Sequence, residues 1–131
     1  MRDPRRYSPA QAVGLAEPVV VQVLPAVSAA NTAAATSSGV DLTGYDGVVA
    51  VVVNCGAITG TMDPKIQDSA DNSSFADVAG LTAAQVATAS QVRVIKFQRR
   101  DVRRYIKFVG TVGTGPVLIG VTLVANKQVS G

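Results

Sequence analysis

Short runs of apolar residues, most of them alternating with polar positions, make up most of the chain beyond residue 34. In Val117–Ala125, for example, every second position is apolar. A period of two is typical of strands that bury one face. About eight such runs, separated by turn residues and without βαβ alternation, predict an all-β fold, a single-domain antiparallel β-sandwich that is jelly-roll-like.

Two runs depart from simple alternation. Val48–Val53 is apolar at every position, which predicts a strand that is buried on both faces at the centre of the core. In the run that begins at Gln91, the apolar phase slips by one residue between Val94 and Ile95. Such a slip predicts a β-bulge.

Glycine and proline indicate the connections. Gly113–Pro116 predicts a hairpin loop, and Pro64 predicts that its strand is an edge strand or is bulged. Leu81–Ala89 is the one segment that predicts a helical turn, because Thr82 can cap it and no Gly or Pro follows, and a loop is the alternative. Arg99–Arg104 predicts a tight connection between two strands.

The first part of the chain differs in composition, with prolines at positions 9, 18 and 25 and arginines near the start. We interpret residues 1–33 as an extended N-terminal arm and residues 34–131 as the β-sandwich domain. Glu17–Leu24 is rich in β-branched residues and predicts an edge strand, since prolines lie at its ends. A disordered tail is the alternative for residues 1–15. Glu17 and the prolines also interrupt any signal peptide.

Composition narrows the chemistry. The chain of 131 residues has no His, no Trp and a single Cys, so it lacks the commonest general base and the commonest metal ligand. We expect no enzyme activity, no cofactor and no metal. No run of apolar residues is long enough to span a membrane, and we expect no membrane partner.

Charge is concentrated in one place. Seven of the twelve basic residues lie between Arg93 and Lys107 with Asp101 as the only acid, so this basic segment carries +6 and the rest of the chain −3. Three interpretations compete: a solvated loop, a surface that docks on an acidic protein, and a nucleic-acid contact. Nucleic acid is disfavoured, since Tyr105 and Phe108 fall on opposite faces of a strand. The candidate protein-interaction residues are Arg2, Arg5, Arg6, Arg99, Arg100, Arg103 and Arg104.

Two further features have ordinary structural explanations. The acidic run of Asp68, Asp71, Asn72 and Asp77 lacks the glycine and the closing glutamate of a calcium loop, which favours a turn. Cys55 follows a Val-rich strand and has no His to activate it, so we expect a buried small hydrophobe.

Three segments carry a resemblance to a known family: Asp41–Val49, Lys65–Val78 and Arg103–Val112. Together they resemble the small β-sandwich head decoration, or cement, proteins of tailed bacteriophages. The similarity extends over roughly residues 35 to 126 and consists of strands and turns, with no catalytic signature. No binding residue can be carried over from it.

The resemblance implies a virion protein on the capsid exterior, present in the host cytoplasm during assembly, that binds the major capsid protein and stabilises the shell. Self-association as a dimer or trimer would let one oligomer engage several capsid subunits. A tail or head-tail joining protein is the first alternative. A nucleic-acid-binding module that uses the basic segment is the second.

Overall fold

The computed structural model describes residues 16–29 and 35–128, which form nine strands and one short 3-10 helix. Within these ranges no helix is long and apolar enough to cross a membrane. The elements are β1 (Ala16–Ala29), β2 (Ala35–Thr36), β3 (Val40–Asp41), β4 (Tyr45–Ile58), β5 (Thr61–Ser69), β6 (Ala76–Thr82), β7 (Gln91–Gln98), η2 (Arg99–Asp101), β8 (Tyr105–Thr114) and β9 (Val117–Gln128).

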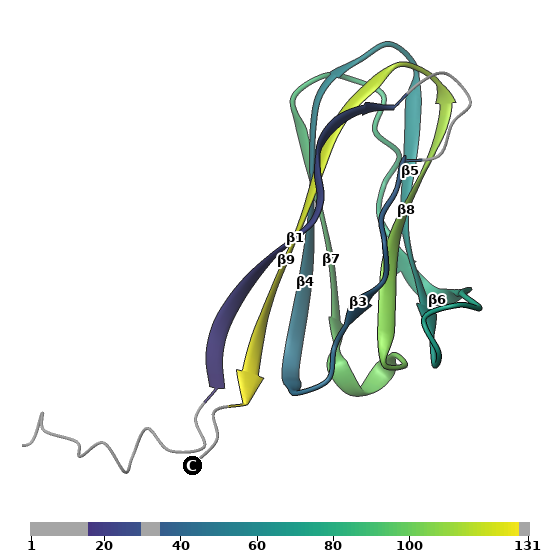
Figure 1. The fold of residues 1–131 in the computed structure, drawn as a ribbon. Helices are drawn as coiled ribbons and strands as arrows, with labels where there is room; N and C mark the ends of the chain where they lie inside the picture. The colour runs from purple at the N-terminus through teal and green to yellow at the C-terminus, as the bar shows by residue number, and fades with distance from the viewer. Residues whose placement is uncertain (1–15, 30–34, 129–131) are drawn as a thin grey trace, which may run out of the picture.

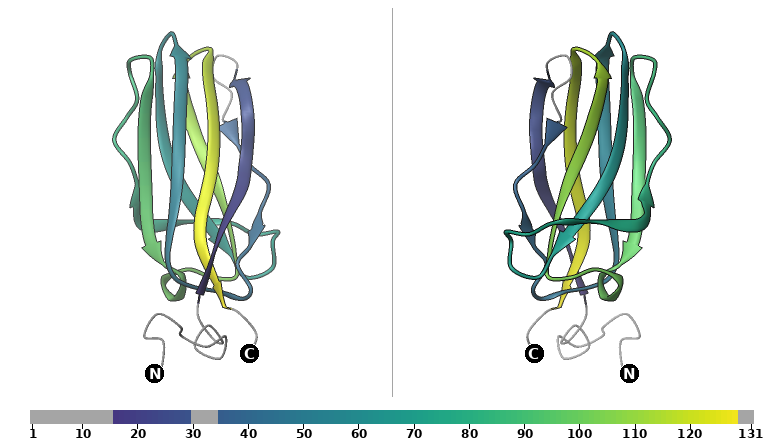
Figure 2. Two further views of the ribbon diagram at one scale, coloured as in Figure 1. Left: turned by 90° about the vertical axis from the view of Figure 1, so that its left-hand side faces the viewer. Right: turned by 90° about the vertical axis from the view of Figure 1, so that its right-hand side faces the viewer.

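The strands form two antiparallel sheets that pack face to face (Figures 1 and 2). The first sheet has the order β1-β9-β4-β7, and the second has the order β2-β8-β5-β6, with β3 also paired to β8. Strand β1 pairs with β9 from Ala16↔Gln128 to Ala29↔Val117, so the beginning of β1 and the end of β9 lie side by side. The predicted all-β sandwich is confirmed.

Strands β2 and β3 act as one interrupted strand along the edge of β8. Thr36 pairs with Val109, and Val40 pairs with Ile106 further along the same strand. Between them, the Ser37 hydroxyl accepts a hydrogen bond from the Phe108 backbone N–H at 2.9 Å, which replaces a contact of the ladder. The Ser37 N–H donates to the Phe108 carbonyl at 3.0 Å.

Counted in this way, the topology is a jelly roll. The chain passes from one sheet to the other at every connection except that between β5 and β6. The predicted hairpin at Gly113–Pro116 is therefore wrong, because β8 and β9 belong to different sheets. Turn residues set where the chain reverses, but the sheet that receives the next strand depends on distant pairing partners.

The core lies between the sheets and is built by alternation. Strand β4 contributes Val49, Val51, Val53 and Cys55, each at most 2 % exposed. Four residues of β9 are likewise at most 2 % exposed. Phe108 of β8 faces them and is fully buried. Val48 of β4 is exposed, so the prediction that Val48–Val53 is buried on both faces is wrong for the isolated chain.

The bulge predicted in β7 is absent. Strand β7 pairs with β4 without a register shift, from Val48↔Gln98 to Cys55↔Gln91. Ile95 and Phe97 point inward, and Val92 and Val94 point outward. The apolar pattern slips between Val94 and Ile95 because the strand is apolar on both faces. No extra residue is inserted in the strand.

Pro64 lies in an interior strand and not at an edge, contrary to the first alternative of the prediction. Its missing N–H faces β6, because the N–H of Met62, two residues earlier, donates to Val86 on that side. Pairing on that side is irregular, with a register shift between Lys65 and Gln67. The second alternative, a bulge at Pro64, is not confirmed, because Pro64 pairs with Gly110 of β8 in an unbroken register and the extra residues of the shift lie on β6, between Asp77 and Thr82.

The helical turn predicted at Leu81–Ala89 is also wrong. Beyond Thr82 the segment is a loop without helix, in which Val86 exchanges two backbone hydrogen bonds with Met62, at 2.8 and 2.9 Å. The Val86 side chain is fully buried. Burial of this side chain and pairing with β5 outweigh the weak local preference for helix.

The edge strand predicted at Glu17–Leu24 is confirmed within β1, which occupies one edge of the first sheet. This part of the predicted arm therefore belongs to the sandwich. Residues 1–15 and 30–34 lie outside the described ranges, and the division at residue 33 stays a prediction.

The alternation in β9 makes a direct test of the core. Leu123 is fully buried, so Leu123→Ala leaves a cavity, and we expect the free energy of unfolding to fall by about 2–5 kcal/mol. The control Thr111→Ala, at an exposed position of β8, changes it by less than about 0.5 kcal/mol. Urea unfolding followed by circular dichroism measures both values. Equal losses would contradict the assignment of the inner face.

Candidate functional site

The outer face of the first sheet carries all the large hydrophobic side chains that are exposed in the described part of the chain. They come from all four strands and are 38–69 % exposed: Val20, Val48, Val92, Val94, Leu118 and Val124. We call this surface, the outward positions of β1, β9, β4 and β7, the apolar face. A continuous exposed apolar surface of this kind usually marks an interaction site.

The pairing registers place these side chains beside one another. Val20 pairs with Val124, which pairs on its other side with Ala50. One step along, Val52 lies between Thr122 and Val94. The outward positions therefore form a grid of mostly apolar neighbours across the sheet.

Charge is nearly absent from this grid. From Val48 to Gly56 of β4 and at the positions paired with them, Lys96 is the only charged outward residue. The outer face of the second sheet differs, since Lys65 of β5 forms an ion pair with Asp77 of β6 at 3.1 Å. The protein thus has one apolar and one charged broad face.

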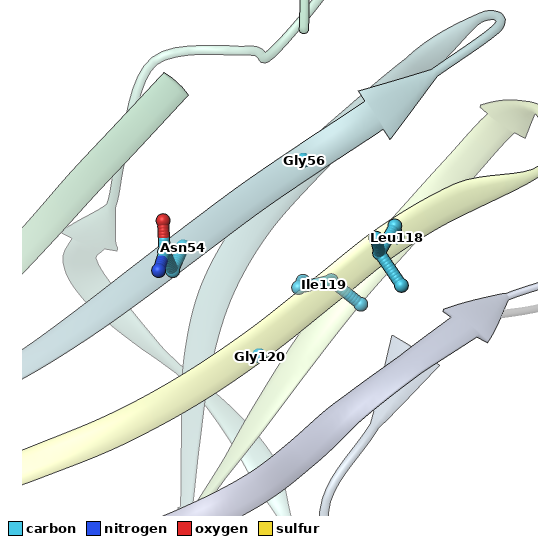
Figure 3. A pocket seen from close by; sticks show the side chains of 5 residues that line it. All are labelled: Asn54, Gly56, Leu118, Ile119 and Gly120. Carbon is cyan, nitrogen blue, oxygen red and sulfur yellow. The ribbon is translucent and has the colours of Figure 1, made fainter. Parts of the chain in front are cut away.

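A shallow hollow of about 210 Å³ opens on the apolar face between β4 and β9 (Figure 3). Its floor lies at Gly56 and Gly120, which have no side chains, and Asn54 and Leu118 stand beside it. Asn54 pairs directly with Gly120. The hollow exists because Gly56 of β4 lies beside Leu118 of β9, and Gly120 of β9 lies beside Asn54 of β4.

The predicted interaction residues Arg99–Arg104 lie at one end of the sandwich, where η2 connects β7 to β8. The structure gives Arg103 an internal partner. Its guanidinium donates to Asp68 Oδ1 from Nη2 at 2.8 Å and from Nε at 3.1 Å, and its backbone N–H donates to Asp68 Oδ2 at 2.9 Å. These bonds hold the connection against the end of β5.

The pKa of the Asp68 carboxyl is shifted by opposing effects. Burial favours the protonated form, but the hydrogen bonds from Arg103 and its positive charge outweigh burial, and the pKa lies below its ordinary value. The same hydrogen bond raises the pKa of Arg103. Both groups are therefore charged at neutral pH, and the pair stabilises the fold.

Arg104 is held in a second pair. Its guanidinium donates from Nε and Nη2 to the two carboxylate oxygens of Asp41 at 3.1 and 3.0 Å, a bidentate arrangement. Its Cζ atom lies 4.9 Å from the centre of the Tyr105 ring. The hydrogen bonds from Arg104 and Thr43 hold the pKa of Asp41 well below its usual range.

Arg99 donates from Nε to the Leu42 carbonyl at 3.0 Å and from Nη1 to the Val102 carbonyl at 3.1 Å. Arg100 is exposed and has no hydrogen bond or ion pair within the described ranges. Three of the four predicted arginines in this connection thus bind their own chain. Arg2, Arg5 and Arg6 lie outside the described residues, and the role of all seven in partner binding stays a prediction.

The acidic run after β5 is a turn. The Asp71 carboxylate accepts hydrogen bonds from the backbone N–H groups of Ser73 and Ser74 and from the Ser69 hydroxyl, which lower its pKa to about 2. Asn72 has a φ of 61°, a conformation that asparagine tolerates better than most residues. Within residues 16–29 and 35–128, no group of three acidic, Cys or His residues is suited to hold a metal ion.

Cys55 is buried in the core, as the sequence indicates. Burial raises the pKa of its thiol, so it is not poised as a nucleophile.

Sequence reasoning missed the apolar face, although a signal was present. A strand that is apolar on both faces needs cover on both faces, and both Val48–Val53 and the Val92/Val94 pair carried that pattern. By sequence alone, the first predicts a central strand and the second predicts a bulge. The structure supplies cover for only one face of each.

No protein-family model matches the sequence, and no curated protein matches it. Solved structures do match. PBSX exported protein XepA has a TM-score of 0.58 and 17 % identity over 86 % of this chain, which spans 37 % of the length of XepA. SPBc2 prophage-derived protein YomS has a TM-score of 0.57 and 11 % identity, with 86 % of this chain and 96 % of YomS covered.

A protein of Bacillus endospore appendages, described as disulfide-linked pili, has a TM-score of 0.50 and 14 % identity. The match covers 89 % of this chain and 93 % of that protein. At these identities the similarity establishes a shared fold.

The Asp68–Arg103 pair makes the stability of the protein depend on pH. The folded pKa of Asp68 lies below the unfolded value near 4, so its contribution is complete above about pH 4 and is lost as the pH falls toward the folded pKa. We expect Asp68→Asn to lower the free energy of unfolding by about 1–3 kcal/mol at pH 7. The deficit should shrink below pH 4.

The matched control is Asp63→Asn on the same strand, where the side-chain amide of Gln85 is the only partner of the carboxylate among residues 16–29 and 35–128. Urea titrations at pH 3 and pH 7 measure both variants. A deficit for Asp68→Asn that does not change with pH would show that the ion pair is not its cause.

Proposed function

We propose that this protein is a structural component of a bacteriophage or prophage particle, and specifically a decoration protein that binds the outside of a capsid and stabilises it. It acts through contacts with other protein surfaces and not through catalysis. The observation that carries the proposal is the apolar face. A broad, nearly uncharged sheet surface has no role in a chain that works alone in water, but it is suited to burial in an assembly.

The fold supports the same conclusion. Related sandwiches occur in a prophage-derived protein and in a protein of spore appendages described as pili. Fold similarity alone does not define a function. Together with the resemblance of Asp41–Val49, Lys65–Val78 and Arg103–Val112 to cement proteins, it favours a particle protein.

The distribution of hydrogen-bond donors favours protein over nucleic acid as the partner. Nucleic-acid binding by the basic segment requires guanidinium groups that are available to phosphates. Arg103 and Arg104 are bound to carboxylates, and Arg99 is bound to carbonyl oxygens of its own chain. Most of the positive charge in the Arg99–Arg104 connection is thus used to hold the connection in place.

The test is binding to capsids assembled without the protein. We expect saturable co-sedimentation at roughly hundreds of copies per particle, together with a higher temperature of capsid disruption. Occupancy near six or twelve copies would instead indicate a tail or neck component. Absence of binding, or binding that leaves the disruption temperature unchanged, would refute a stabilising role.

A pair of charged variants tests whether the apolar face takes part. Val94→Glu places a carboxylate on that face, and we expect it to weaken particle binding at least tenfold, because the charge must lose its water when the face is buried in the assembly, whichever protein surface covers it. Thr111→Glu makes the same change of charge on the outer face of the second sheet and should bind like the wild type. Equal binding of both variants would remove the apolar face from the proposal.

A further inference from the structure

The pattern of large and small residues on the two central strands points to the occupant of the apolar face. Strands β9 and β4 lie in the middle of the sheet, with β1 and β7 outside them (Figure 2). In three of four successive rows across these two strands, a larger outward residue lies beside a smaller one. Three rows are register pairs: Val124 and Ala50, Thr122 and Val52, and Gly120 and Asn54. The fourth row, Leu118 and Gly56, lies where the register shifts between Cys55 and Ile58, and the two residues lie beside each other there.

The rows follow from the register. Val124 pairs with Ala50 and Asn54 pairs with Gly120, so the larger residue is on β9 in the first row and on β4 in the third. In the second row, Thr122 and Val52 are nearly equal in shape. In the fourth row, Leu118 lies against Gly56, where an added Cβ would come within 3.1 Å of the leucine side chain.

A two-fold axis that runs parallel to the strands, between β4 and β9, turns this pattern into complementarity. Such an axis places β9 of one copy over β4 of the other and keeps each row at the same height. Leu118 of one copy then stands over Gly56 of the second copy, at the hollow of about 210 Å³, which has room for an isobutyl group. Val124 stands over Ala50 in the same way. Facing layers pack well when large residues meet small ones.

The electrostatics and the area are compatible with this contact. Lys96 lies on β7 at the rim of the apolar face, so no like charges meet at its centre. Four strands of about eight residues cover roughly 500 Å² per copy at ordinary strand spacing, or roughly 1,000 Å² for a pair, which reaches the lower limit of specific interfaces. Aligned packing of two sheets is the ordinary geometry of β-sandwiches.

We propose that the apolar face binds a second copy of this chain in a two-fold symmetric dimer, in which Leu118 of each copy enters the Gly56/Gly120 hollow of the other. The proposal deepens the proposed function, because it names the partner that covers this face and leaves the other surfaces of the dimer for the capsid. It predicts a dimer of four stacked sheets, in which the two apolar faces form an additional core between the copies.

The experiment is sedimentation equilibrium of the full chain over roughly 1–500 μM protein, which measures the dissociation constant of the dimer. We expect a monomer–dimer equilibrium for the wild type. Gly56→Leu fills the hollow and should weaken dimerisation roughly 10- to 100-fold. Thr111→Leu makes a comparable apolar change on the opposite sheet and should leave the dissociation constant unchanged.

The double variant Gly56→Leu/Leu118→Ala tests the symmetry itself. It moves the large residue from β9 to β4 and the small one from β4 to β9, and the proposed axis exchanges these strands, so dimerisation should recover. Melting curves by circular dichroism check that every variant is folded. A folded double variant that stays as weak as Gly56→Leu overturns the arrangement.

Other results for the wild type also decide the matter. A monomer at all concentrations overturns the dimer, and so does a trimer. A wild-type monomer that still binds capsids would refute this dimer and leave the proposed function in place. A dimer that fails to bind capsids would refute the proposed function and leave this dimer in place.

Discussion

Side chains on a β-strand alternate between its two faces, and in β4 this alternation governs the character of the whole molecule. Because valine or alanine occupies every position from Val48 to Val53, the strand cannot bury one set of side chains without presenting the other. The buried set forms the core with β9 and the second sheet. The outward set forms the centre of the apolar face. The property that stabilises the monomer therefore also makes its surface suited to association.

The arginine pairs serve a different purpose from the one that their density in the sequence indicates. The connection between β7 and β8 crosses from one sheet to the other, and it has no apolar side chain except Val102 to hold it in place. Asp68 lies at the end of β5 and Asp41 at the end of β3, so Arg103 and Arg104 fasten the crossing to both strands. These two ion pairs close the end of the sandwich.

How far the sequence predicted this protein depended on the range of the interaction. Local patterns were sufficient for the sandwich, for the edge strand in β1, for the Asp71 turn and for the burial of Cys55. They were insufficient where the partner is distant in sequence. Asp68 and Asp41 lie 35 and 63 residues from the arginines that they bind, and no local signal links them. The same reason explains the errors at Gly113–Pro116 and Leu81–Ala89, since pairing across the fold decided both.

The pairing of Ala16 with Gln128 gives the molecule a direction. The described chain enters at β1 and leaves at β9 at one end of the sandwich, while the β4–β5 and β8–β9 connections lie at the other (Figure 1). A two-fold axis parallel to the strands preserves that direction, so both copies of a dimer would present their chain ends on the same side. Such a dimer is a polar building block. Sequences joined to either end would be displayed together toward one side of a particle, away from the side that carries the β4–β5 and β8–β9 connections.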